Sequence, residues 1–217
     1  RTDFPIIEYL RIEDGYLGYL DLSTATDILA TFATIKGQAG GEETTELQAK
    51  GKFNGRPLIL KLNAGPLVTL REAEIPYPLT LDLQAGKNSI KVDGTLVQPL
   101  ELKDFDLYFV VQSPNPEQLE QILGLPLPSL PPYQFEGKLS DNDNILQIKD
   151  LSGQVGDSDM VGDVSVNLNK EQILITADLT SQNIDLDDFA PIIGLAPGTG
   201  PGETSTAAQK REAKDKK

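Results

Sequence analysis

The chain has 217 residues and contains no cysteine, histidine or tryptophan, which excludes a thiol nucleophile, a Ser-His-Asp relay and a zinc site built from cysteine and histidine. Lys and Arg total 19 against 33 Asp and Glu, and the net charge of -14 would repel a phosphate backbone, so no nucleic-acid partner is expected. A chain of this length can bury a core of its own.

Most of the chain alternates between apolar and polar residues with a period of two, which is typical of strands with one dry face and one wet face. The alternation is weak over residues 28–36 and becomes clear in a row formed by Leu58, Leu60 and Leu62. Three further rows follow at 79–83, 90–96 and 105–111. The residues Ala-Gly-Lys-Asn at 85–88 predict a hairpin turn between the first two of these rows.

The second half of the chain continues the same pattern, with apolar rows at 133–139, 160–168 and 173–179. In total, eight to ten strands are expected within residues 1–192. One short helix is predicted at 116–124, because Pro116 suits a first helical turn and Gly124 suits a helix exit. From residue 197 onward the chain is rich in Pro, Gly and Thr without apolar periodicity, which predicts a strand-rich region at 1–196 and a disordered linker or tail at 197–217.

Three segments superficially resemble ligand sites. The residues Asp-Asn-Asp-Asn at 141–144 begin like a calcium loop, but Ile145 stands where a third oxygen ligand would be, so a polar hairpin is favoured. The glycine-rich segment 198–204 lacks the lysine of a phosphate loop and is interpreted as a linker. Asp185, Asp187 and Asp188 could form a carboxylate pair, but a solvated acidic face is the preferred interpretation. No catalytic residue, metal ligand or cofactor is therefore assigned.

An ordered set of motifs begins with Leu-Gly-Leu-Pro at 123–126 and a proline-rich entry, Leu-Pro-Pro-Tyr, at 130–133. Phe-Glu-Gly-Lys-Leu at 135–139, Gly-Asp-Ser at 156–158 and Ile-Asp-Leu-Asp-Asp at 184–188 follow. In this order the motifs resemble those of the AsmA family. The resemblance is good over residues 79–196 and only compatible over 1–78, and it departs at 170–172, where relatives carry an Arg-Pro pair and this chain has Lys-Glu-Gln.

The motif residues are interpreted as structural. Gly156 and Gly162 predict a bend or bulge, and Ser158 is expected to bond locally to the backbone of a turn. The complete set of motif positions is Gly124, Pro132, Tyr133, Gly156, Ser158 and Gly162.

The resemblance implies a mainly β fold of the repeating β-groove type, in which an elongated, curved antiparallel sheet with one or two short helices forms an open apolar groove. A closed sandwich would show the same apolar rows, and composition does not decide between the two. The residues expected to line the groove are those of the apolar rows: Leu79, Leu81, Leu83, Ile90, Val92, Leu96, Leu107, Phe109, Val111, Phe135, Met160, Val164, Val166, Ile173, Ile175 and Leu179.

The resemblance also implies a non-enzymatic function. AsmA-like proteins are similar to bridge-like lipid carriers, so the chain is expected to be a periplasmic segment that shields phospholipid acyl chains between the inner and outer membranes of a Gram-negative envelope. The expected partners are a phospholipid or other envelope lipid, the inner membrane through an anchor outside this chain, and other copies through exposed strand edges.

Two alternatives remain open at this point. The same sheet could be the closed core of a scaffold or assembly factor for outer-membrane proteins, acting through surface contacts. A carbohydrate-binding sandwich is less favoured, because the chain has no tryptophan to stack on a sugar.

Overall fold

The structure is a computed structural model that describes residues 10–36, 43–71, 75–114, 130–169, 174–193 and 195–215. The helix predicted at 116–124, including Gly124, and the groove candidate Ile173 lie outside the described residues.

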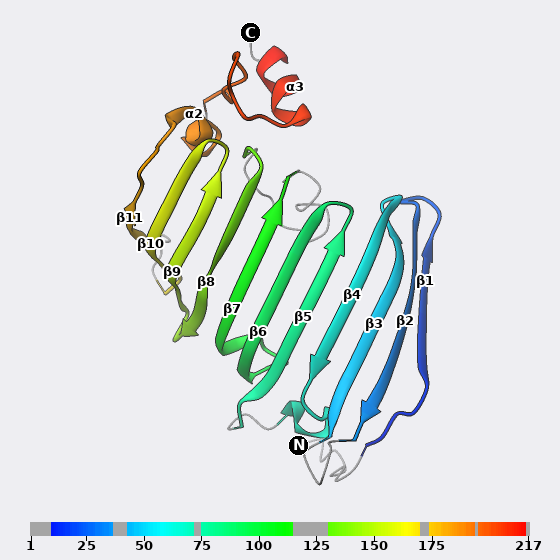
Figure 1. The fold of residues 1–217 in the computed structure, drawn as a ribbon. Coiled ribbons are helices and arrows are strands. Elements are labelled where there is room, and N and C mark those ends of the chain that lie inside the picture. The colour runs from blue at the N-terminus through cyan, green and yellow to red at the C-terminus, as the bar shows by residue number, and fades with distance from the viewer. Residues whose placement is uncertain are drawn as a thin grey trace.

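Eleven strands form one antiparallel sheet in which each strand pairs with its neighbours in sequence (Figure 1). The order β1 to β11 across the sheet is therefore the order along the chain. The strands are β1 (Gly15–Asp21), β2 (Thr26–Ile35), β3 (Thr44–Phe53), β4 (Arg56–Ala64), β5 (Tyr77–Ala85), β6 (Asn88–Gln98), β7 (Lys103–Ser113), β8 (Tyr133–Asn142), β9 (Ile145–Val155), β10 (Ser158–Asn167) and β11 (Leu174–Thr180).

Tight turns connect most of these strands. Gly86 has a φ of 63° in the turn between β5 and β6, as the hairpin signal at 85–88 predicted. Asp143 and Asn144, with φ values of 51° and 59°, form the turn between β8 and β9. The segment that begins like a calcium loop is thus a polar hairpin.

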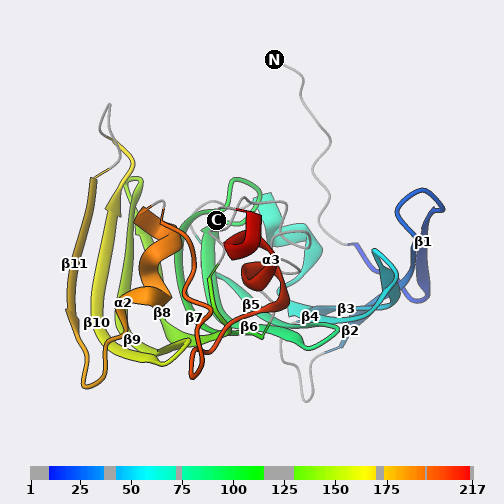
Figure 2. The same cartoon turned by 90° about the horizontal axis from the view of Figure 1, so that it is seen from above.

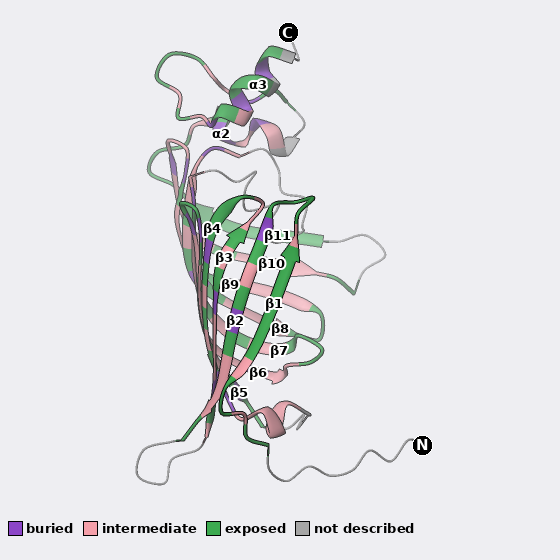
Figure 3. Ribbon diagram, turned by 90° about the vertical axis from the view of Figure 1, so that its right-hand side faces the viewer, coloured by how far each residue is buried: buried purple, intermediate pink, exposed green. Residues whose placement is uncertain are grey.

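The sheet is open and strongly curved, with β1 and β11 at its two edges (Figure 2). The described strands belong to one sheet, so the closed two-sheet sandwich is not the architecture. The predicted mainly β, curved, antiparallel fold is confirmed. Figure 3 shows why such a sheet has little core: buried residues are few and scattered among strands that are half-buried or exposed.

The apolar face of the sheet is its concave face. Tyr77 lies on this face, and its hydroxyl donates to the Gly65 carbonyl at 2.7 Å, just before the 3-10 helix η2 (Leu67–Arg71). Ser158 lies on the same face at the start of β10 and donates to Asp188 of helix α2 (Leu186–Phe189) at 2.7 Å. Both η2 and α2 lie on the concave side of the sheet (Figures 2 and 3).

Glycines inside the strands allow this curvature. Gly94 and Gly162 have φ values of 153° and 146°, and a Cβ at either position would come within 2.1 Å of a neighbouring-strand carbonyl oxygen. Both lie on the concave face, where a bent sheet crowds its side chains. The pairing register of β10 also shifts between Gly162 and Val164, which confirms the bulge predicted near Gly162.

The chain beyond β11 forms α2, the 3-10 helix η3 (Ala190–Ile193) and helix α3 (Ala207–Asp215). Helix α3 occupies part of the segment for which the sequence predicted a linker or tail. Thr206 and Gln209 form a capping box at its start. The backbone N–H of Gln209 donates to the Thr206 hydroxyl at 3.1 Å, and the backbone N–H of Thr206 donates to the Gln209 side-chain oxygen at 2.9 Å. The repeated Pro and Gly at 197–202 conceal this local signal. The boundary at residue 196 stays a prediction.

Candidate functional site: a continuous apolar concave face

The strand register aligns the apolar side chains of the concave face into three rungs, two of ten residues and one of eleven. A rung here is a line of residues paired from strand to strand, with at most one from each strand; rung 2 also crosses the register shift between β8 and β9, where Gly137 and Leu151 are not directly paired. Rung 1 contains Leu17, Ala30, Ala49, Leu60, Leu83, Ile90, Val111, Phe135, Gly153 and Met160. Rung 2 contains Gly15, Phe32, Leu47, Leu62, Leu81, Val92, Phe109 and Gly137 and continues through Leu151, Gly162 and Leu179.

Rung 3 completes the central band and contains Thr34, Thr45, Ala64, Leu79, Gly94, Leu107, Leu139, Ile148, Val164 and Ala177. No charged residue interrupts these three rungs among the described residues. We call them together the apolar band. At about 4.8 Å per strand, ten steps between eleven strands give the band a path of roughly 48 Å.

The structure places the described groove candidates on this one face. Most belong to the three rungs, whereas Leu96, Val166 and Ile175 lie on paired positions next to rung 3. The candidates from Leu79 to Val166 are half-buried, except Leu96, which is buried, while Ile175 and Leu179 on the edge strand β11 are 65% and 43% exposed. No second layer of the described chain covers the band as a whole, and most of its side chains are half-buried, whereas Ala30, Ala49, Ala64 and Leu151 are buried.

The band extends into strands that the sequence did not identify as lining residues. Strands β1 to β4 contribute Leu17, Phe32, Leu47, Leu60 and Leu62. The Leu58–Leu62 alternation was a usable signal for β4. In β3 the concave residues include Ala49 and Gly51, which are too small to give a clear alternation.

Polar side chains lie on the concave face near the ends of the strands. Ser113 is fully buried, and its hydroxyl donates to the side-chain oxygen of Asn88 at 2.8 Å. The side-chain NH₂ group of Asn88 donates to the Ala85 carbonyl at 3.1 Å. Thr45 donates to the Gly65 carbonyl at 3.0 Å. The hydrogen bonds of these polar side chains are thus formed within the protein.

The convex face is polar and is tied together by cross-strand pairs. Thr80 donates to Asp93 at 2.8 Å. Tyr108 donates to Glu136 at 2.7 Å, and this hydrogen bond raises the pKa of the Tyr108 hydroxyl. Lys138 forms an ion pair with Asp150 at 2.8 Å. These exposed pairs contribute little stability individually, but they make one face of the sheet compatible with water.

A second polar arrangement joins α2 to the turn between β9 and β10. The buried Asp188 carboxylate accepts hydrogen bonds from the backbone amides of Asp157 and Ser158 at 3.0 and 2.9 Å and from the Ser158 hydroxyl. Burial raises the pKa of Asp188, and the three hydrogen bonds oppose that shift. We call this arrangement the Asp188 clamp. Ser158 therefore bonds to a residue 30 positions away, not locally as the sequence predicted.

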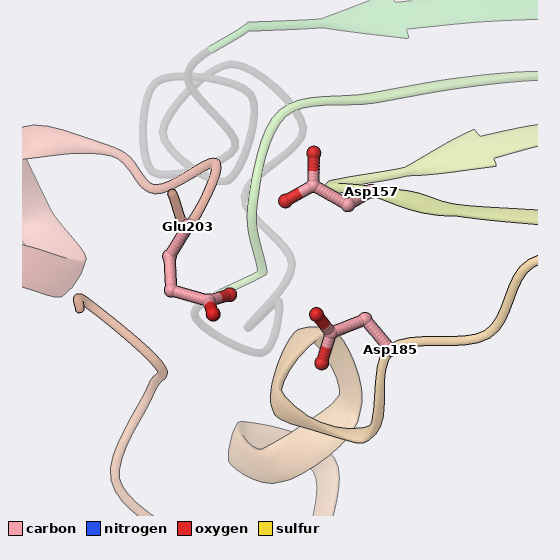
Figure 4. Close-up of side chains that lie close together, drawn as sticks. All are labelled: Asp157, Asp185 and Glu203. Carbon is pink, nitrogen blue, oxygen red and sulfur yellow. The ribbon is translucent and has the colours of Figure 1, made fainter. Parts of the chain in front are cut away.

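Carboxylates gather beside the clamp, where Asp157, Asp185 and Glu203 bring oxygens within 4.8 Å of one another (Figure 4). The charge of Asp185 raises the pKa of Glu203, whereas hydrogen bonds from Thr204 lower the pKa of Asp157. Asp185 caps α2 by accepting from the Asp187 amide at 3.0 Å. The expected solvated acidic face is wrong for Asp188, which is buried and holds α2 against the turn between β9 and β10. The cluster of Asp157, Asp185 and Glu203 alone does not define a cation site.

An open one-layer sheet with an apolar concave face and a polar convex face defines a groove-forming β protein. No family model matches the chain, and no solved structure matches it. The AsmA family protein YhjG of Escherichia coli (strain K12) is 27% identical over 230 aligned residues, which cover 99% of this chain and 34% of the relative. The chain therefore spans about a third of the length of this curated relative. Along nearly its entire length, this chain is thus similar to an AsmA family protein.

Proposed function

We propose that the apolar band holds the acyl chains of phospholipids and lets them move along the sheet in a Gram-negative cell envelope. The observation that carries this proposal is the continuity of the band, three neutral rungs across neighbouring strands that no second layer of the described chain covers as a whole. The relationship to an AsmA family protein supports an envelope role, and the periplasm is the proposed location. None of the helices described here is long and apolar enough to span a membrane.

The energetics favour a passive carrier. Moving an acyl chain through water costs about 0.8 kcal/mol per methylene, or roughly 12 kcal/mol for a sixteen-carbon chain. A continuous apolar surface removes most of this cost without creating one deep binding site. Since a bilayer interior is equally apolar, transfer onto the band is close to neutral, and a lipid can slide from rung to rung. This task needs no catalytic group.

The test places a charge in the band. Val166→Asp and Ile175→Asp each put a carboxylate beside rung 3 on β10 or β11, where an acyl chain would have to desolvate it. We expect bound phospholipid, measured by mass spectrometry of the purified protein, to fall by about tenfold, which corresponds to about 1.4 kcal/mol. Ser165→Asp is the matched control, because Ser165 lies next to Val166 but points to the convex face.

The outcome separates the proposal from its alternative. Unchanged phospholipid in folded Val166→Asp and Ile175→Asp proteins would contradict an acyl-chain path on this face. Purified wild-type protein that carries no lipid and takes none up from vesicles would favour the scaffold function instead.

A further inference from the structure

The two ends of strands β3 to β7 differ in charge and polarity. We call the end that carries the β3–β4 and β5–β6 turns the upper rim, as it is drawn in Figure 1. Arg56 begins β4 directly after the first of these turns, Lys87 lies in the second, and both are exposed. Residues 53–57 and 85–88 contain no carboxylate, so this part of the rim is basic in a chain whose net charge is -14. The carboxylate cluster of Figure 4 lies further along the sheet, beside β9 and β10.

A backbone hydrogen bond joins the two basic turns. The N–H of Gly86 donates to the Pro57 carbonyl at 2.9 Å, which places the turn that carries Lys87 beside the start of β4. Because side chains alternate along a strand, Arg56 shares the concave face with Leu58 and with Leu60 of rung 1. A guanidinium and an ammonium group at the border of an apolar face suit an anionic group such as a phosphate.

The opposite ends of these strands, which we call the lower rim, are more apolar. Ile75, just before β5, is 53% exposed, and Leu100 and Leu102 between β6 and β7 are 64% and 69% exposed. Lys103 at this rim is ion-paired with Glu101 at 2.9 Å. Among the described residues of β3 to β7, the upper rim is therefore the better place for an anion and the lower rim the better place for the end of an acyl chain.

The length of β4 matches the length of a phospholipid. From Arg56 to Ala64 the strand covers roughly 26 Å. A phospholipid fills half of a bilayer that is about 40–45 Å thick with its headgroup regions, which is about 20–22 Å. A lipid with its phosphate at the upper rim and its acyl chains parallel to the strands thus crosses all three rungs and ends near the exposed aliphatic residues of the lower rim.

We propose that Arg56 and Lys87 bind the phosphate group of a phospholipid whose acyl chains lie across the apolar band, parallel to the strands. This inference rests on the proposed function, because it assigns the headgroup end of the same lipid site. The acyl chains supply most of the binding free energy, and the two exposed cations determine which rim the headgroup occupies. In this orientation a lipid moves along the sheet sideways, without turning over.

Two lipids with the same acyl chains separate the two parts of this site. Phosphatidylglycerol carries a phosphate and diacylglycerol does not, and each is delivered from a cyclodextrin complex. We expect the double variant Arg56→Glu with Lys87→Glu to take up about fivefold less phosphatidylglycerol, with unchanged uptake of diacylglycerol. Arg56→Gln with Lys87→Gln should show a smaller loss in the same direction.

A second double variant, Lys50→Glu with Lys61→Glu, is the matched control. Both lysines are exposed, and both lie on the convex face, so the net charge changes equally while the upper rim stays intact. We expect its uptake of both lipids to equal that of the wild type. An equal loss of phosphatidylglycerol in the control would mean that net charge, and not the upper rim, determines uptake.

The outcomes distinguish this inference from the function on which it rests. Wild-type protein that takes up neither lipid would contradict the proposed function and, with it, this inference. Diacylglycerol uptake by the wild type together with unchanged phosphatidylglycerol uptake in the two rim variants would leave the acyl-chain function standing and overturn the phosphate site. Inorganic phosphate that binds the wild type as tightly as phosphatidylglycerol does would identify a site for a free anion and would also overturn the inference.

A photoreactive lipid tests the orientation. Phosphatidylglycerol with a photoreactive group at the end of one acyl chain should crosslink to residues 75–76 and 100–102 at the lower rim and not to residues 54–57 or 85–88. Mass spectrometry of the crosslinked peptides measures this distribution. Labelling mainly at the upper rim, or equal labelling of both rims, would refute the orientation that we assign.

Discussion

At the scale of single residues, the glycines of the concave face show where the bend imposes a requirement on the sequence. Gly94 combines a positive φ with a Cβ position 2.1 Å from the Asp106 carbonyl oxygen. Both the backbone conformation and the close approach exclude a side chain. Gly18 differs, since a Cβ there would meet nothing and its backbone conformation is not restricted to glycine.

We therefore expect Gly94→Ala to destabilise the protein by about 2–4 kcal/mol, because strand β7 must move away from β6. Gly18→Ala should change the free energy of unfolding by no more than about 0.5 kcal/mol. Urea unfolding followed by circular dichroism measures both. Equal stabilities of the two variants would show that the bend does not depend on the close approach at Gly94.

The crowded carboxylates near Glu203 predict a pH dependence with a definite sign. The charges of Asp185, Asp187, Asp157 and Asp188 raise the pKa of Glu203 above its ordinary value of 4.5. A carboxyl group with a raised pKa destabilises the folded state when it is ionised, so the penalty is absent below about pH 4.5 and complete above the raised pKa.

Glu203→Gln should therefore slow amide hydrogen exchange in residues 197–206 at pH 7, once exchange rates are corrected for pH, and should have no such effect below pH 4.5. Glu13→Gln, at the other end of the chain, is the control for a lost charge. Slower exchange at both pH values would mean that the substitution acts through something other than charge.

At the scale of elements, the Asp188 clamp attaches α2 to the turn between β9 and β10. Asp188→Ala would leave the amides of Asp157 and Ser158 without their acceptor, which costs about 1–3 kcal/mol. We expect faster hydrogen exchange in residues 181–193 and a lower unfolding temperature. Asp188→Asn retains an accepting oxygen and should show a smaller effect, and Asp188→Ala protein with wild-type exchange would contradict the clamp.

The strands differ in how clearly the alternation of apolar and polar residues predicts them. Residues 79–111 alternate large aliphatic or aromatic residues with polar ones, and the structure has three paired strands there. Strand β3 gave no clear signal because its concave positions are partly Ala and Gly. In β9, Ile148 and Leu151 share a face although they are an odd number of residues apart, because the pairing register shifts between them. A strict period of two cannot anticipate such a bulge.

The candidate site was partly predictable, because alternation within a strand shows which residues share its apolar face. How these faces join across the sheet into rungs depends on the pairing register, which the structure provides. The role of Ser158 could not be predicted, because its partners Asp185 and Asp188 lie 27 and 30 residues further along the chain. Contacts of this range depend on the return of the chain after β11, which no local pattern encodes.

At the scale of the whole molecule, the strand order β1 to β11 has a further consequence for how such proteins vary in size. Every connection joins adjacent strands, so no hairpin has to be threaded past another during folding, and sheet formation can proceed from local pairings. Duplication or loss of one hairpin would lengthen or shorten the sheet by about 10 Å while leaving the remaining pairings unchanged. The length of the sheet can thus change in steps of one hairpin without a redesign of the fold.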